Sequence, residues 1–259
     1  MNNIYDINDI GALLANNTYP GRGIIIGKSE DGKNAVYAYF IMGRSENSRN
    51  RVFVEKDGAL FTEPYDFSKV SDPSLIIYAA VRNHENKTVV TNGDQTDTVY
   101  EYIKRGKSMN DALKTRAFEP DAPNLTPRIS GMLTLGEGDF SYEMSILKSM
   151  DEEGSACARY TWDYPSVNGL GHFIHTYICD GNPIPTFCGE PERVAIPNNI
   201  DTLTEKLWNN LNEANKISLY VRYTDLATGE VEGAILCSNC IADLGFSTVD
   251  ITLDWLNQL

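Results

Sequence analysis

The stretch that decides the fold class is Asn34-Ala-Val-Tyr-Ala-Tyr-Phe-Ile-Met42. It is rich in β-branched and aromatic residues, which favour strands, and its apolar run is unbroken. A strand with one face in water alternates polar and apolar residues, so this stretch predicts a strand buried on both faces. A second strand is expected at 22–28, with a turn at 29–33 between the two. Together they favour a sheet that other layers cover on both sides.

Strands and helices are expected in blocks along the rest of the chain. The other strands are expected at 51–55, 59–62, 74–81, 88–92, 128–135, 142–148, 158–162, 172–179, 217–224 and 232–237. Helices are expected at 4–16, 96–105, 108–118, 201–214 and 252–259. This order indicates the α+β class, with stacked sheets between helical layers. We expect an N-terminal helical extension at 1–18 and a single domain at 19–259.

Charge and cysteine content exclude several classes of protein. The 259 residues carry 22 Lys and Arg against 36 Asp and Glu, a formal net charge of −14, which argues against nucleic acid as a partner. No apolar run approaches the roughly 20 residues that span a bilayer, and the opening residues lack the features of a signal peptide. Cys237 and Cys240 have metal or redox spacing without a second pair, so we expect buried or incidental thiols. We therefore expect a cytoplasmic protein with no membrane partner and no metal site.

Arginine is concentrated in one part of this acidic chain. Four of the eleven arginines, including Arg22, Arg44 and Arg51, lie between residues 22 and 51. Most of this cluster follows directly on the buried strand at 34–42, together with Ser45. Guanidinium groups beside hydroxyls and open backbone amides suit a phosphate monoester. A solvated charged loop is the alternative.

Two further polar clusters stand at the ends of expected elements. The first, with Asn92, Gly93 and Asp94, lies between a strand and a helix, where Asp94 or Thr96 can cap the helix or exposed amides can meet a ligand. The second is a loop stiffened by three prolines, which carries Glu119, Asp121, Asn124, Thr126 and Arg128. That loop suits either ligand placement or a structural crossover. These residues alone predict a polar or phosphorylated small molecule bound by loops at strand ends.

Five separated motifs carry a resemblance to a known family. They are Tyr19-Pro-Gly-Arg-Gly23, Arg44-Ser-x-x-Ser-Arg-Asn-Arg51, Thr91-Asn-Gly-Asp-Gln-Thr-Asp97, Asn124-Leu-Thr-Pro-Arg-Ile-Ser-Gly131 and Gly189-Glu-Pro191. Over about residues 19–240 the sequence resembles the archaeal-type inosine monophosphate (IMP) cyclohydrolases and their bacterial relatives. It departs from the archaeal pattern in its first 18 residues and in extra length in its second half.

The resemblance implies a fold and an activity. The fold is a four-layer αββα sandwich like that of N-terminal-nucleophile hydrolases, without self-processing, because the first sheet strand begins near Arg22 rather than at Cys, Ser or Thr. The activity is the closure of formamidoimidazole-carboxamide ribonucleotide (FAICAR) to IMP in purine biosynthesis, with a purine nucleotide as ligand and no cofactor. Family relatives assemble, which leaves a homo-oligomer open. A nucleotide-binding protein without catalysis, and an amidohydrolase processed near Asn17-Thr18, are the alternatives.

The resemblance also suggests roles for the polar residues. Arg22 and Tyr78 are expected as donors near the reacting centre, with Glu119 as general base or orienting group. The phosphate or ribose is expected at Arg44, Ser45 and Arg51. The residues expected to bind hydroxyls and the purine edge, or to complete the substrate site, are Asn92, Gly93, Asp94, Asn124, Thr126 and Arg128. Tyr78 as an ordinary core tyrosine and Glu119 as a structural carboxylate stay open.

Overall fold

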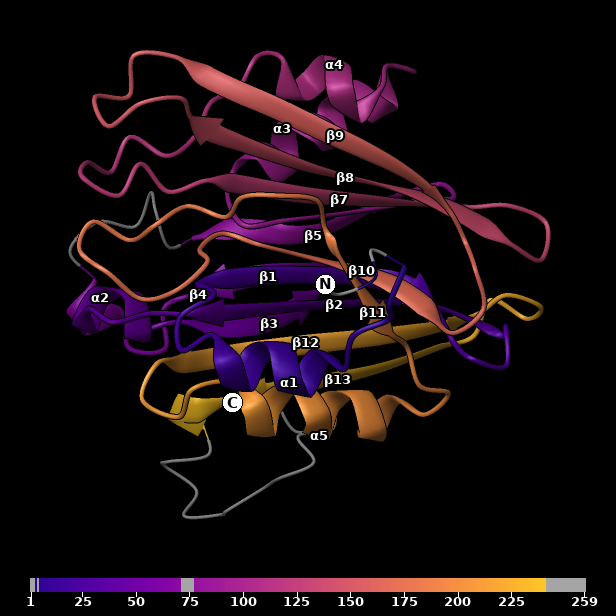
Figure 1. Ribbon diagram of the computed structural model, residues 1–259. Helices are drawn as coiled ribbons and strands as arrows, with labels where there is room; N and C mark the ends of the chain where they lie inside the picture. Colours follow the sequence, from indigo (N-terminus) through magenta and orange to yellow (C-terminus); the bar gives the residue numbers. More distant parts are fainter. Residues whose placement is uncertain (1–2, 4, 71–76, 241–259) are drawn as a thin grey trace.

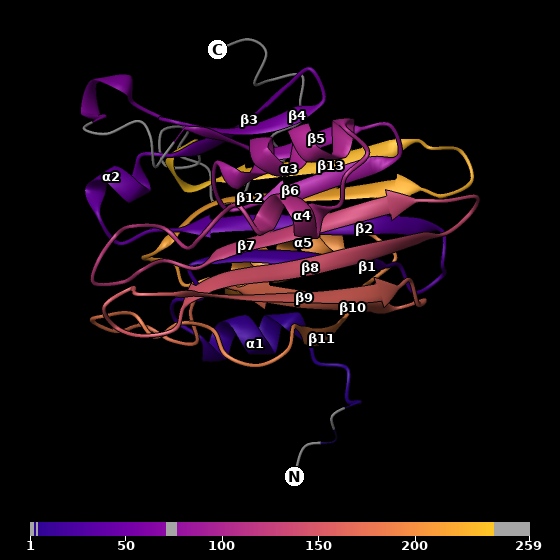
Figure 2. The same cartoon turned by 90° about the horizontal axis from the view of Figure 1, so that it is seen from above.

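Two antiparallel sheets stack face to face in the computed structural model, which describes residues 3, 5–70 and 77–240 (Figure 1). The six-stranded sheet has the order β11 (Glu192–Ala195), β10 (Leu170–His175), β1 (Arg22–Lys28), β2 (Asn34–Met42), β12 (Lys216–Asp225) and β13 (Val231–Cys237). The seven-stranded sheet is a meander of β3 (Val52–Lys56), β4 (Ala59–Glu63), β5 (Tyr78–His84), β6 (Lys87–Thr91), β7 (Arg128–Leu135), β8 (Phe140–Ser149) and β9 (Cys157–Pro165). Seen from above, the strands of both sheets run in about the same direction (Figure 2).

Helices cover the outer face of each sheet. Helices α3 (Gln95–Lys104) and α4 (Met109–Leu113) lie on the seven-stranded sheet, where α3 packs on β5 and β6. On the six-stranded sheet, α5 (Ile200–Asn210) packs on β12, and α1 (Ile10–Asn16) packs beside α5. Two short helices, α2 (Glu46–Arg49) and η1 (Phe67–Lys69), lie in the connections. The predicted α+β class, with stacked sheets between helices, is confirmed.

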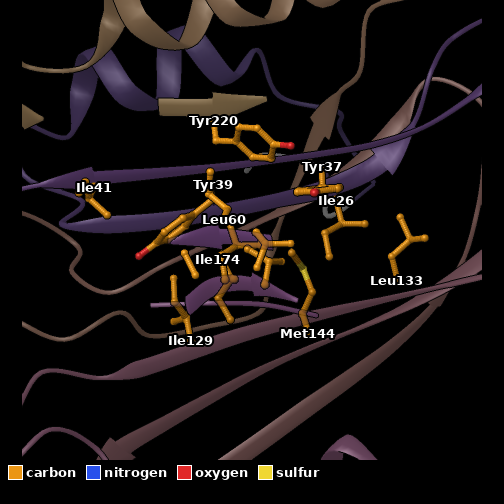
Figure 3. Packing of buried hydrophobic residues seen from close by; sticks show 14 of the residues in the cluster. Ile26, Tyr37, Tyr39, Ile41, Leu60, Ile129, Leu133, Met144, Ile174 and Tyr220 are labelled. Atoms are coloured by element: carbon orange, nitrogen blue, oxygen red, sulfur yellow. The ribbon is translucent and has the colours of Figure 1, made fainter. Parts of the chain in front are cut away.

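Strand β2 shows why the unbroken apolar run needs two partners. Its side chains at Tyr37, Tyr39 and Ile41 belong to the core between the sheets, where they face residues of the other sheet such as Ile129 and Met144 (Figure 3). The alternate positions Val36, Ala38, Phe40 and Met42 belong to the second core, under α1 and α5. The predicted burial of both faces is confirmed, because successive side chains of a strand point to opposite sides.

Several predicted boundaries are wrong. The helix expected at 4–16 begins at Ile10, because Asn8 instead forms a bridge to Val194 and Asp9 caps the helix through Ala12 N (3.0 Å). The helix expected at 108–118 ends at Leu113. The strand expected at 172–179 ends at His175, because the chain there turns back and Phe187 N donates to Thr176 O.

Other elements were missed or cannot be compared. The four residues of β11 and of α2 carry too little periodicity to predict either element. The helix expected at 252–259 and the first part of the strand expected at 74–81 lie outside the described residues. Cys237 and Cys240 are buried beside Val52, as expected for structural thiols.

Candidate functional site

A cavity of about 320 Å³ opens at one end of the sandwich, where β1 begins, β2 ends and β7 begins. Its wall includes seven of the predicted site residues: Arg22, Arg44, Ser45, Arg51, Glu119, Asn124 and Thr126. The same wall includes Asp121, which was named in the proline-rich loop without a role of its own, and five residues that were not nominated: Tyr19, Asn47, Ser48, Tyr177 and Ile184. Three motifs that are far apart in the sequence therefore meet in one place.

Arg22 enters the cavity from the first position of β1. Its backbone is held on both sides, since Arg22 N donates to Thr176 Oγ1 (3.1 Å) and Thr176 N donates to Arg22 O (3.0 Å). Gly21, with φ of 76°, has no room for a side chain, because a Cβ there would lie 2.3 Å from Thr176 Oγ1. The buried Nε of Arg22 has no hydrogen-bond partner in the described part of the chain. Arg22 thus has a fixed backbone, and its Nε–H is a hydrogen-bond donor that a ligand can use.

The charge of Arg22 is maintained despite its burial. Burial by itself lowers the pKa of Arg22, but the negative charge of Glu119 and the nearby tyrosines, Tyr177 first, outweigh it, so this pKa lies above its ordinary value. Arg22 therefore stays a cation at any physiological pH.

Arg51 is a second buried cation at the same end. It is only 1% exposed, and its Nε donates to Ser48 O (2.7 Å) while Nη2 donates to Met42 O (3.2 Å). Burial, followed by the positive charge of Arg22, lowers the pKa of Arg51. Neither guanidinium forms an ion pair within the described residues. Two neighbouring cations without a paired carboxylate make this end of the cavity suited to an anion.

Glu119 is the buried carboxylate of the cavity. It follows α4, and its N–H donates to Thr126 O (2.9 Å). Burial raises the pKa of Glu119, although the positive charges of Arg22 and then Arg128 oppose that shift. A Cβ on Gly93 would lie 3.6 Å from Glu119 Oε1, which places Gly93 beside this carboxylate. A buried carboxyl group with a raised pKa is suited to exchange protons with a ligand.

Arg44 and Ser45 form the mouth of the cavity. The Arg44 guanidinium lies over the Tyr19 ring (5.1 Å to the centroid) and donates from Nη1 to Asp180 Oδ1 (2.5 Å) and to Gly181 O (2.9 Å). Ser45 caps α2 by accepting from Ser48 N (3.1 Å). Both side chains are exposed, so they can reach a ligand that enters from solvent.

Four predicted residues, Asn92, Gly93, Asp94 and Arg128, do not line the cavity. Asn92 is buried and fully used, since Nδ2 donates to Pro127 O (2.8 Å) and Oδ1 accepts from Ile129 N (2.9 Å). Asp94 stands at the N-cap of α3 without capping it, and its Oδ1 pairs with Arg128 Nη1 (2.6 Å). Burial opposes ionisation of Asp94, but hydrogen bonding from Arg116 and the charge of Arg128 lower its pKa overall. This network holds the end of the proline-rich loop, where β7 begins.

Tyr78 sits between the cavity and the core. Its hydroxyl lies 2.8 Å from that of Tyr39, so one tyrosine of each sheet takes part in the pair. Tyr78 is 6% exposed and does not line the cavity, yet it is near enough to contribute to the raised pKa of Arg22 and to oppose the lowering of the pKa of Arg51. The structure is thus compatible with a core tyrosine that also influences the arginines.

The missed residues differ in the signal they left in the sequence. Tyr19, Asn47 and Ser48 stand inside motifs already singled out, so their neighbours pointed to them. Tyr177 and Ile184 follow β10, and only the pairing of β10 with β1 brings them to Arg22. No local pattern could have nominated them.

The fold and the cavity define an α+β sandwich protein with a buried cationic site at its strand ends. Residues 19–230 match the family described as IMP cyclohydrolase-like protein, and the chain belongs to this family. An IMP cyclohydrolase of Methanopyrus kandleri is 36% identical over 153 residues, covering 55% of this chain and 75% of that protein. One of Methanococcus maripaludis is 30% identical over 162 residues, covering 60% of this chain and 79% of that protein. Among the described residues, no helix is long and apolar enough to cross a membrane.

Proposed function

We propose that this protein is an IMP cyclohydrolase, which closes FAICAR to IMP with loss of water in purine biosynthesis. One observation carries the proposal beyond family membership: the buried carboxyl group of Glu119, the buried guanidinium group of Arg51 and the half-buried one of Arg22 share one cavity of small-molecule size. A nucleotide supplies the anion that the cations lack, and cyclisation needs the proton exchange that the carboxyl group offers.

The reaction places few demands on the protein. The carboxamide nitrogen attacks the formyl carbon of the same molecule, and the formyl oxygen becomes a hydroxyl that leaves as water with one proton from each of two nitrogens. Because both partners are tethered, the site mainly holds the formyl group in the reactive rotamer. It also stabilises the developing oxyanion and moves protons, and one well-placed donor contributes about 3 kcal/mol to that step.

We assign the roles by position in the cavity. Arg22 is the donor to the oxyanion, since its buried Nε has no other partner among the described residues. Glu119 exchanges the protons, and Tyr78 supports Arg22 from the core side. The phosphate or ribose lies toward the mouth, and the set that binds it is Arg44, Ser45 and Arg51. Asn124 and Thr126 lie beside the purine edge, whereas substrate contacts of Asn92, Gly93, Asp94 and Arg128 stay predictions.

The test is direct turnover. Purified protein incubated with FAICAR is expected to form IMP, and chromatography of the nucleotides measures the conversion. Binding of IMP in a calorimeter without any conversion of FAICAR would instead indicate a nucleotide-binding protein. Absence of both by folded protein contradicts the proposal.

Four properties of the whole chain stay predictions. The fold is expected to resemble that of N-terminal-nucleophile hydrolases without self-processing. Intact mass spectrometry that finds Met1 still at the N-terminus tests the absence of processing. The division into an extension at 1–18 and a domain at 19–259 requires residues 19–259 to fold alone. Cytoplasmic location and homo-oligomer formation are tested by cell fractionation and light scattering.

A further inference from the structure

Tyr177 connects the two sheets at the wall of the cavity. It follows β10 of the six-stranded sheet and is 1% exposed. Its hydroxyl lies 2.6 Å from Thr126 Oγ1, which belongs to the loop that leads into β7 of the other sheet. The Tyr177 side chain therefore reaches from the sheet that carries Arg22 to the loop that carries Glu119.

The hydrogen bonds have one direction. Thr126 Oγ1 donates its single proton to Asp121 Oδ2, so Tyr177 must donate to Thr126. Burial raises the pKa of Tyr177 to about 12, against the lowering effect of Arg22, so the phenol keeps its proton at neutral pH. The Tyr177 hydroxyl thus donates to Thr126, and the Thr126 hydroxyl donates to the Asp121 carboxylate.

The donor is held rigidly. The Tyr177 ring stacks on Tyr19 with 5.9 Å between centroids and 16° between planes. The Tyr177 carbonyl accepts from Asn17 Nδ2 (3.0 Å) and lies 2.8 Å from His175 Nδ1. A side chain fixed at both its ring and its backbone holds the Thr126 end of the proline-rich loop in a defined place.

Thr126 passes this constraint on to Glu119. Its N–H donates to Asp121 Oδ1 (2.6 Å), its hydroxyl is shared by Asp121 and Tyr177, and its carbonyl accepts from Glu119 N (2.9 Å). All polar groups of Thr126 are therefore engaged inside the protein. We propose that Tyr177 is a positioning residue, whose hydroxyl sets the place of Glu119 relative to Arg22 through Thr126. This inference rests on the proposed function.

The test replaces Tyr177 by phenylalanine, which keeps the ring and removes the hydroxyl. A displacement near 1 Å at a reacting centre costs about 10²-fold in rate, so Tyr177→Phe is expected to lower kcat by roughly 10- to 100-fold. KM for FAICAR is expected to change by less than about 3-fold, because Tyr177 does not need to touch the substrate.

Tyr142 provides a matched control. Its hydroxyl also joins the two sheets, at 2.6 Å from His172 Nδ1, and it is also buried. Burial and the charge of Arg193 lower the pKa of His172 to about 4, so this is a neutral hydrogen bond as well. His172 pairs with Ile26, which lies four residues along β1 from Arg22. This control pair is therefore about 13 Å from Arg22 along the strand. Tyr142→Phe is expected to lower the melting temperature as much as Tyr177→Phe, with kcat unchanged.

Each outcome decides the inference. A Tyr177→Phe enzyme with wild-type kcat, or with a raised KM and wild-type kcat, overturns it, and so does an equal loss of kcat in Tyr142→Phe. Adding Tyr177→Phe to Glu119→Gln should cause no further loss of kcat, since Tyr177 acts through Glu119; additive losses would contradict this. A wild-type protein that forms no IMP overturns the proposed function and this role together, whereas the other outcomes overturn this role alone.

Discussion

The space between the two sheets is apolar in its middle and charged at one end. Ile26, Ile129 and Met144 belong to the core in the middle and have almost no exposed surface (Figure 3). At the cavity end, the same space holds Arg22, Arg51 and Glu119 instead. Burying unpaired charges destabilises a fold, whereas burying apolar side chains stabilises it. The charged end therefore destabilises the fold and the apolar middle stabilises it. This is expected at a site where a bound ligand neutralises the buried charges.

Strand β1 contains this change within itself. Ile24 and Ile26 face the other sheet, and Arg22 occupies the next position on the same face, because side chains alternate along a strand. An apolar residue at this position would simply extend the core. The difference between the two regions thus depends on single positions of shared strands, and it can be tested position by position.

The largest expected effect is on catalysis at the charged end. Glu119→Gln removes the proton-exchanging group while keeping its size, so kcat is expected to fall about 10²- to 10⁴-fold with little change in KM. Steady-state kinetics with FAICAR measures this, and circular dichroism checks the fold. A change confined to KM would contradict the role of Glu119.

A comparable effect on stability is expected in the middle. Ile26→Ala leaves a cavity between the sheets and is expected to lower the free energy of unfolding by about 2–5 kcal/mol. Urea unfolding measures the loss. Activity per folded molecule should stay at the wild-type level; a large loss of kcat would mean that the two regions are not independent.

A smaller effect is expected at the mouth of the cavity. Arg44→Ala removes a charged donor to the ligand, so KM is expected to rise about 10- to 100-fold with kcat nearly unchanged. Its exposed pair with Asp180 contributes under about 1 kcal/mol, so stability should barely change. Arg82→Ala is the matched control, because Arg82 also pairs with an aspartate, Asp97, and lies over an aromatic ring. An equal rise of KM in both variants would exclude a specific role for Arg44.

The smallest effect is a pH dependence of stability. Because burial raises the pKa of Glu119 in the folded state, its contribution to stability is complete below the ordinary value of 4.5 and is lost as the pH rises through the folded pKa. Relative to Glu119→Gln, the wild-type protein should therefore become less stable as the pH rises above 4.5. Urea unfolding of both proteins across this range measures the difference. An opposite slope would mean that the arginines dominate the environment of Glu119.

Much of the fold and part of the site could be predicted from local pattern. The strands at 22–28, 34–42 and 128–135 match β1, β2 and β7 to the residue, because their apolar runs are bounded by turn residues. Arg22, Arg51 and Glu119 could be nominated because each stands at the end of an expected element. By contrast, Asn92 and Asp94 looked equally suitable, yet in the structure they bind Pro127 and Arg128 and do not line the cavity.

The sequence by itself determined which segments form strands, that one sheet is covered on both faces, and where the arginines concentrate. These properties follow from the side chains of neighbouring residues, whose periodicity is local. Only the tertiary structure decided that β10 lies beside β1, and hence that Tyr177 reaches Thr126 and stands near Arg22. Strand order and sheet stacking depend on the free energy of contacts between residues far apart in the chain, which no local pattern records.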